Sequence, residues 1–197
     1  MEKAIFARHG ESVFNAIDVV NGDIAVPGGL TPAGIEQAHA LGESLREQPI
    51  DVCIVSEFER AQQTADLALK GRNVPRLVWP ELNDPLYGTY EGKLLEEYRA
   101  WAGANPSRAV PGEKGESRYA IVQRYARAFR ELLARPEDVL FVVCHSLPVS
   151  YALGGREGIA PGARVPLAGN ATPYPFTTTE LERAVDVLEA WLAAPTW

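Results

Sequence analysis

The sequence predicts a three-layer α/β/α sandwich with a mostly parallel central sheet. Short runs of apolar, β-branched residues alternate along the chain with longer runs in which apolar residues recur at helical spacing. The strand-like runs are apolar on both faces, which is typical of parallel strands covered by helices on either side. No repeat or long linker divides the 197 residues. We therefore expect a single domain over residues 1–197, with a small helical lobe at about residues 82–116 over one edge of the sheet.

Three strands and two helices are predicted in the first half of the chain. The helix at 30–47 is the clearest, because Thr31 is a good N-cap and Pro32 suits the first helical position. Apolar residues follow at helical spacing at Ile35, Ala38 and Leu41. In order, the expected elements are a strand at 3–8, the helix at 30–47, a strand at 51–56, a helix at 57–70 and a strand at 76–79.

The second half begins with a loop at 82–93, which is rich in Pro, Gly and Asn, and ends with an amphipathic helix at 179–194. Thr179 and Glu182 have the spacing of a capping box for that last helix. Between them we expect a short helix at 94–102, a loop at 111–115, a long helix at 117–134, the most apolar strand at 139–144, a helix at 146–153, and a Gly- and Pro-rich stretch at 154–175 with strand potential at 164–167.

Composition and charge exclude several classes of function. The chain has 19 basic and 26 acidic residues and a formal net charge of -7, which argues against nucleic acid and anionic membranes as partners. No run approaches the roughly 18 apolar residues of a membrane helix, and the N-terminus lacks the apolar stretch of a signal peptide. Cys53 and Cys144 lie in strand-like runs and suggest no disulfide scaffold. We expect a cytoplasmic protein.

Polar residues cluster where the predicted strands end. Arg8 and His9 follow the first strand, Arg60 follows the second, and His145 follows the most apolar one. Ligands of parallel sheets collect at this edge, and Asn15 could reach it. Two imidazoles beside two guanidiniums are unfavourable unless an anion lies between them. The pattern therefore predicts a phosphate site.

The same residue types suit phosphoryl transfer. Arginine offers paired donors to phosphate oxygens, and a neutral imidazole nitrogen can attack phosphorus. A second histidine can stabilise charge on the transferred group, as a metal ion does elsewhere. His9, His39 and His145 are not at metal-ligand spacings, and the cysteines form no paired motif. We therefore expect no metal and no cofactor, and we assign His39 to structure.

Six motifs occur in order along the chain. They are RHGES at 8–12 with Asn15, GLTPAGIEQA at 29–38, SEFERAQQTA at 56–65, GTYEG at 88–92, GES at 115–117 with Arg124 downstream, and VVCHS at 142–146. This ordered set, from residue 5 to about 175, resembles the histidine phosphatase superfamily in its phosphoglycerate mutase-like branch. That superfamily contains cofactor-dependent phosphoglycerate mutases and many small phosphatases.

The resemblance implies a role for each strand-end residue. His9 would be the nucleophile and form a phosphohistidine. Arg8, Arg60 and His145 would cradle the phosphoryl group, and Asn15 would assist. Attack by water on the phosphohistidine would then release phosphate.

Two acidic residues are candidates for the proton donor. Family members carry an acid a few residues before the glycine that corresponds to Gly88, and the matching residue is Asp84. Many members have glutamate there, and Glu81, just upstream, is the rival candidate. An acid that works near neutral pH needs a raised pKa, and the expected positive charge around it opposes that.

Two other departures from the family pattern leave alternatives open. Ser146 stands where glycine is common, and its hydroxyl either contacts substrate or caps the helix that follows; we favour the cap. The loop at 20–29 fits the family pattern poorly. It either shapes substrate choice or has no such role.

The sequence therefore predicts a metal-independent phosphatase that acts on a small phosphorylated metabolite. The stretch between Gly92 and Ser117 is short, and its basic residues are few: Lys93, Arg99, Arg108 and Lys114. A mutase must hold a second phosphate, so this favours a phosphatase over the alternative of a cofactor-dependent phosphoglycerate mutase. A catalytically weak phosphoester-binding module on the same fold is a second alternative. A homodimer through an edge strand or the tail at 191–197 is left open.

Overall fold

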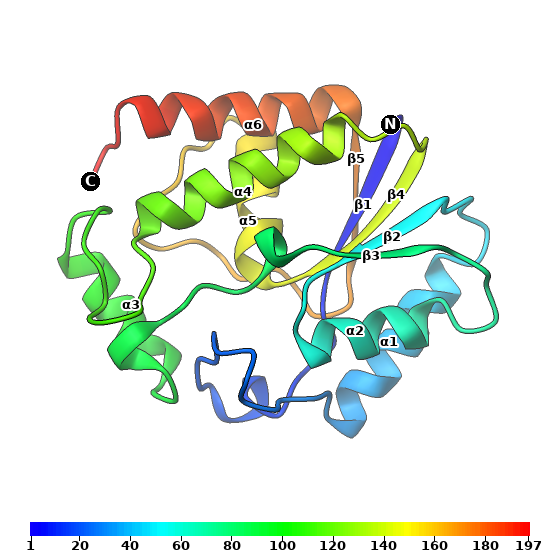
Figure 1. Cartoon of the computed structure of the whole chain (residues 1–197), viewed down its shortest axis with the longest axis horizontal. Coiled ribbons are helices and arrows are strands. Elements are labelled where there is room, and N and C mark those ends of the chain that lie inside the picture. Colours follow the sequence, from blue (N-terminus) through cyan, green and yellow to red (C-terminus); the bar gives the residue numbers. More distant parts are fainter.

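A five-stranded sheet with strand order β3-β2-β4-β1-β5 forms the centre of the computed structural model, which describes all 197 residues (Figure 1). β4 pairs in parallel with β1 and β2, and β2 pairs in parallel with β3. β5 runs antiparallel to β1 at the edge. The strands are β1 (Lys3–Arg8), β2 (Val52–Val55), β3 (Arg76–Val78), β4 (Val139–Cys144) and β5 (Pro173–Thr177). The predicted, mostly parallel sheet is confirmed.

Helices cover both faces of this sheet (Figure 1). One face carries α1 (Pro32–Ser44) and α2 (Glu59–Ala68), and the other carries α4 (Arg118–Leu133), α5 (Ser146–Arg156) and α6 (Thr178–Ala193). Alternate residues of β1 divide between the two resulting cores: Ala4 and Phe6 join one, Ile5 and Ala7 the other. The three-layer sandwich is therefore the architecture that the apolar strands predict.

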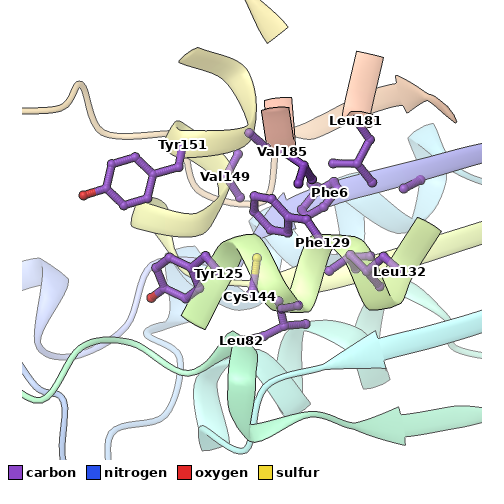
Figure 2. Packing of buried hydrophobic residues seen from close by; sticks show 14 of the residues in the cluster. Phe6, Leu82, Tyr125, Phe129, Leu132, Cys144, Val149, Tyr151, Leu181 and Val185 are labelled. Atoms are coloured by element: carbon purple, nitrogen blue, oxygen red, sulfur yellow. The ribbon is translucent and has the colours of Figure 1, made fainter. Parts of the chain in front are cut away.

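The larger core lies under α4, α5 and α6. Phe6 of β1 lies between the rings of Phe129 and Phe176, at centroid distances of 5.4 and 5.3 Å and in edge-to-face orientation. Figure 2 shows Val185 and Leu181 of α6 closing over Phe6. This packing fixes α4 and α6 against the strand that ends at Arg8.

Local sequence signals explain the helix starts. Thr31 accepts a hydrogen bond from the Gly34 amide and Pro32 is the first residue of α1, as predicted. Ser117 caps α4 in the same way. The capping box of α6 is formed by Thr177 and Glu180 and not by the predicted pair two residues later. The same spacing occurs twice in TTTELE, and the helix begins directly after β5.

The strand predicted at 164–167 is wrong, because the edge of the sheet is filled by β5 at 173–177. Proline lacks an N–H donor and is tolerated in an edge strand, which explains why Pro173 and Pro175 did not stand out as strand residues. Residues 164–167 instead form part of the wall of a large cavity.

The segment from 82 to 116 lies beyond the end of the sheet and contains α3 (Leu95–Ala104) (Figure 1). Its side chains form a small apolar cluster of their own, in which Tyr98 packs edge to face against Tyr87, with ring centroids 4.7 Å apart. Val20 joins this cluster from the 20–29 loop. α3 is thereby held close to the carboxyl ends of the strands. None of the helices is long and apolar enough to cross a membrane.

Candidate active site

A cavity of about 290 Å³ opens at the carboxyl ends of the central strands. Arg8 ends β1, and Arg60 lies in the first turn of α2, just after β2. Both line the cavity, together with His9, Asn15 and Asp84. The residues that the sequence assigned to different strand ends are thus brought together.

His9 is held as a neutral imidazole with one defined tautomer. Its ring is 2% exposed, and its Nδ1 lies 2.7 Å from the Gly10 carbonyl oxygen, so Nδ1 carries the proton. Nε2 therefore has a lone pair, and Arg60 Nε donates to it at 3.1 Å. Burial, followed by the charges of Arg60 and Arg8, holds the His9 pKa well below its usual value. The arrangement presents a nucleophilic nitrogen inside a cationic pocket.

His145 lies directly behind the cavity wall and is fully buried. Its ring meets that of His9 edge to face, with centroids 5.2 Å apart. Nε2 lies 2.9 Å from Ser56 Oγ, and Nδ1 lies 3.5 Å from both Arg60 Nη2 and Asp84 Oδ2. Burial and the charge of Arg60 hold the His145 pKa well below its usual value. Ser56, which fixes the ring, was not among the predicted site residues.

Arg60 is oriented by the 20–29 loop. Its Nη1 donates to Asn21 Oδ1 at 2.7 Å, and its Nη2 donates to the Asn21 carbonyl at 3.0 Å. The Phe58 ring lies 4.1 Å from the Arg60 guanidinium carbon. The loop whose role the sequence left open therefore positions Arg60, one of the arginines predicted to bind phosphate, and the sequence analysis missed Asn21 in this role.

Asp84 faces the same cluster. Its Oδ2 accepts from Arg60 Nη2 at 3.1 Å, and its side chain is 17% exposed. Burial raises the Asp84 pKa, and the nearby Arg60 and Arg8 oppose this without cancelling it. The positive surroundings therefore do not prevent a raised pKa. Glu81, the rival acid, does not line the cavity.

The loop that carries Asp84 is anchored to α4. Arg124 Nη1 and the Tyr125 hydroxyl both donate to the Asn83 carbonyl, each at 2.8 Å. Arg124 is held in turn by both carboxylate oxygens of Glu116, at 2.8 and 3.0 Å. The GES motif and the arginine downstream thus fix the backbone next to the acid.

Arg8 and Asn15 complete the wall near His9. Arg8 Nη1 donates to the Ala168 carbonyl at 2.9 Å, while its Nε has no partner. Asn15 Oδ1 accepts from the Ser12 amide at 3.2 Å and from Asn170 Nδ2 at 3.4 Å. Asn170 also donates to the His9 carbonyl at 2.9 Å. Asn170 is a second residue that the sequence analysis missed.

Ser146 lines the cavity but does not cap α5, so the favoured interpretation is wrong. Its Oγ accepts from the Ala168 amide at 2.9 Å, and the N-cap residue of α5 is His145. The hydroxyl thus holds the loop that follows α5 at Ala168, the residue whose carbonyl accepts from Arg8.

Metal-binding geometry is not found in the structure. No group of three or more His, Cys, Asp or Glu side chains is arranged to hold a metal ion. His39 lies on α1 and does not line the cavity.

Comparison with known proteins adds independent evidence. The model of the histidine phosphatase superfamily (branch 1) matches residues 4–190. An adenosylcobalamin/alpha-ribazole phosphatase of Salmonella typhimurium is 37% identical over 147 residues, which is 70% of this chain and 71% of the relative. A 2,3-bisphosphoglycerate-dependent phosphoglycerate mutase of Chlamydia trachomatis is 29% identical over 164 residues, 66% of this chain and 72% of the relative. The crystal structure of a putative alpha-ribazole-5'-P phosphatase from Escherichia coli superposes with a TM-score of 0.74 and 28% identity, covering 89% of this chain and 90% of that one.

Proposed function

The chain belongs to the histidine phosphatase superfamily, branch 1, and is a phosphatase, and we propose that His9 Nε2 is its nucleophile. The observation that carries this proposal is the tautomer of His9. Its Nδ1–H donates to the Gly10 carbonyl, so the lone pair of Nε2 points at the guanidinium of Arg60 in the cavity. A neutral imidazole whose Nε2 carries no proton is the form that can attack phosphorus once Arg60 Nε no longer donates to that lone pair.

In the first half-reaction Nε2 attacks the phosphorus atom of a phosphomonoester. A bond from nitrogen to phosphorus forms, and the ester bond from phosphorus to oxygen breaks. Arg60 Nε, which donates a hydrogen bond to His9 Nε2 in the free protein, then donates to a phosphoryl oxygen instead. Arg8 and His145 bind the other oxygens, with Asn15 near them. Asp84 gives its proton to the departing alkoxide, and its raised pKa keeps that proton available at higher pH than an ordinary aspartate would.

In the second half-reaction water attacks the phosphohistidine. The Asp84 carboxylate left by the first step takes the proton of the water, the bond from nitrogen to phosphorus breaks, and inorganic phosphate leaves. His9 returns to its neutral form. The guanidiniums of Arg8 and Arg60 supply the positive charge that the developing phosphoryl oxygens require, so the proposed cycle uses no metal.

The substrate class in this proposal is a small phosphomonoester. The cavity of about 290 Å³ supports it, because a space of this size fits a small metabolite. The names of the relatives make alpha-ribazole 5'-phosphate the first compound to test.

The test is release of phosphate from p-nitrophenyl phosphate and from a panel of phosphomonoesters, with His9→Ala as the control. We expect turnover by the unaltered chain and none above background by the variant. Equal rates in the two proteins would overturn the role of His9. Interconversion of 3- and 2-phosphoglycerate with a bisphosphoglycerate primer, at a rate above phosphate release, would instead establish the mutase alternative.

A further inference from the structure

Four buried side-chain atoms in the structure have no hydrogen-bond partner: Arg8 Nε, Tyr98 Oη, Arg118 Nε and Trp197 Nε1. Three of them belong to residues that line the active-site cavity. The missing partner of Arg8 Nε is explained by the phosphoryl group that Arg8 would bind. Tyr98 and Arg118 have no part in the proposed chemistry. Buried polar groups without partners are rare, so this pair requires an explanation.

Arg118 is the more unusual of the two. It is the first residue of α4, it is only 6% exposed, and its one hydrogen bond runs from Nη1 to the Tyr151 hydroxyl at 3.3 Å. That hydroxyl points out of the hydrophobic cluster (Figure 2). None of the salt bridges in the structure includes Arg118. A guanidinium keeps its charge in proteins, and a buried charge without a counterion is unfavourable.

The acidic residues of the cavity do not supply the missing counterion. Glu11 accepts from Thr31 Oγ1 at 2.7 Å, and Asp84 accepts from Arg60 at 3.1 Å. Asp18 is exposed, and no oxygen of it lies within salt-bridge distance of Arg118. The positive charge of Arg118 therefore remains uncompensated by the protein.

Tyr98 and Arg99 of α3 are further hydrogen-bond donors in the same cavity. The Tyr98 ring lies 5.4 Å from the Arg118 guanidinium carbon, and its hydroxyl is buried without a partner. Arg99 follows Tyr98 on α3, lines the cavity and forms no salt bridge, whereas Arg164, which also lines the cavity, is paired with Glu96. The Tyr98 hydroxyl can accept a hydrogen bond from Arg118, but it brings no negative charge. The pair therefore still lacks an acceptor for the Tyr98 proton and a counterion for Arg118.

The residues of this cluster come from other elements than those of the phosphoryl site. Tyr98 and Arg99 lie on α3 and Arg118 begins α4, whereas His9 and His145 follow β1 and β4. The Tyr87 ring packs against Tyr98 on the side of the acid loop, three residues after Asp84. The two sets of donors therefore reach one cavity from two groups of elements, the strand ends and the helices α3 and α4.

We propose that Arg118, Tyr98 and Arg99 form a second oxyanion subsite, so that the substrate is a phosphomonoester with a carboxylate or a second phosphate away from the transferred phosphoryl group. The inference rests on the proposed function, because it requires the phosphoryl end to be bound at His9. Arginine matches both kinds of oxyanion through paired donors, and exclusion of water strengthens the interaction.

The experiment uses straight-chain alkyl phosphates of two to six carbons that end in a carboxylate, a phosphate or a hydroxyl group. At the best chain length, we expect kcat/KM to favour a charged end over the hydroxyl by about 10- to 100-fold, the range of a charge-assisted hydrogen bond. The carboxylate and phosphate arms decide which oxyanion fits. Arg118→Gln should abolish this preference, so that the ratio of kcat/KM between the charged and the hydroxyl end falls to about 1. Arg127→Gln, an exposed arginine on the same helix, should leave it unchanged.

Tyr98→Phe keeps the test decisive if Arg118→Gln fails to fold. It removes a hydroxyl that has no partner in the protein, so the melting temperature should not fall, while the preference for a charged end should drop by about 3- to 10-fold. Equal kcat/KM for charged and hydroxyl ends at every length would overturn the subsite and leave the phosphatase intact. A preference that survives in both variants would also overturn it. No hydrolysis of any compound by the unaltered chain would overturn the proposed function and this inference with it.

Discussion

The two walls of the active-site cavity are built differently. On the strand-end wall, Arg60 connects His9, Asn21, Asp84 and His145 through one guanidinium, so the central cation of that wall already has an acidic partner in Asp84. On the wall formed by α3 and α4, Arg118 has no acidic partner at all. The first wall is organised before substrate arrives, which suits the chemical step. The second is completed only by a ligand, which suits recognition.

The largest expected effect comes from removing the acid of the strand-end wall, Asp84. Asp84→Asn should lower kcat/KM for an alkyl phosphate by about 10²- to 10⁴-fold, because an alkoxide cannot leave without a proton. The same variant should lose far less on p-nitrophenyl phosphate, whose leaving group is stable as an anion. Steady-state kinetics on the two esters measure the difference. An equal loss on both esters would mean that Asp84 only positions Arg60.

A matched substitution separates Asp84 from its rival. Glu81→Gln should change neither ester's kcat/KM by more than about twofold, since surface changes away from the site have small effects. Loss of alkyl phosphate hydrolysis in Glu81→Gln, with full activity in Asp84→Asn, would move the acid to Glu81.

The next effect concerns the loop that orients Arg60. Asn21→Ala removes the acceptor of Arg60 Nη1 and should lower kcat/KM by about 10- to 100-fold, the range of one hydrogen bond to a charged group. The loss should occur on alkyl and aryl phosphates alike, because Arg60 acts on the phosphoryl group that both share. Stopped assays of phosphate release measure it. Unchanged kinetics would show that the loop does not position Arg60.

Protonation of the buried histidines provides a stability test of the same wall. His145 has a lowered pKa in the folded chain, whereas in the unfolded chain it binds a proton below about pH 6.5. The unfolded state therefore gains protons, and the free energy of unfolding falls, as the pH drops below that value. Between pH 7.5 and 5.5 this histidine should account for about 1.4 kcal/mol of the loss.

Urea unfolding of the unaltered chain and of His145→Asn at both pH values measures this contribution. The stability difference between the two proteins should shrink at pH 5.5, because only the unaltered chain has this histidine to protonate on unfolding. Parallel pH dependence in the two proteins would contradict the depressed pKa.

The smallest expected effect is at Ser56. Ser56→Ala removes a neutral hydrogen bond to His145 Nε2 and should lower kcat by about 2- to 10-fold. Comparison of kcat for the two proteins at saturating p-nitrophenyl phosphate checks this. A loss as large as that of Asn21→Ala would mean that the orientation of His145 matters as much as that of Arg60.

The sequence could predict only part of the site, and residues of the same wall differ in this respect. The sheet, most helix bounds and the convergence of Arg8, His9, Arg60 and His145 follow from local patterns, because each residue stands next to an apolar strand or inside a short motif. Asn21 and Asn170 do not, because they act across 39 and 161 residues, on Arg60 and His9, and nothing near them in sequence marks those contacts.

Arg118 could have been found from its helical position. It lies three, four and seven residues before Ile121, Val122 and Tyr125, all of them buried, so it occupies the apolar face of α4. A charged residue on such a face needs a partner or a ligand. The sequence analysis did not find β5, because Pro173 and Pro175 are untypical of strands. They are tolerated there because β5 is an edge strand that pairs with β1.

The most direct test of the account is to identify the residue that carries the phosphoryl group during turnover. Rapid quenching of the enzyme with p-nitrophenyl phosphate under alkaline conditions, followed by mass spectrometry of its peptides, should place one phosphoryl group on His9, labile to acid and absent from His9→Ala. A phosphoryl group on any other residue, or full turnover by His9→Ala, would contradict the account.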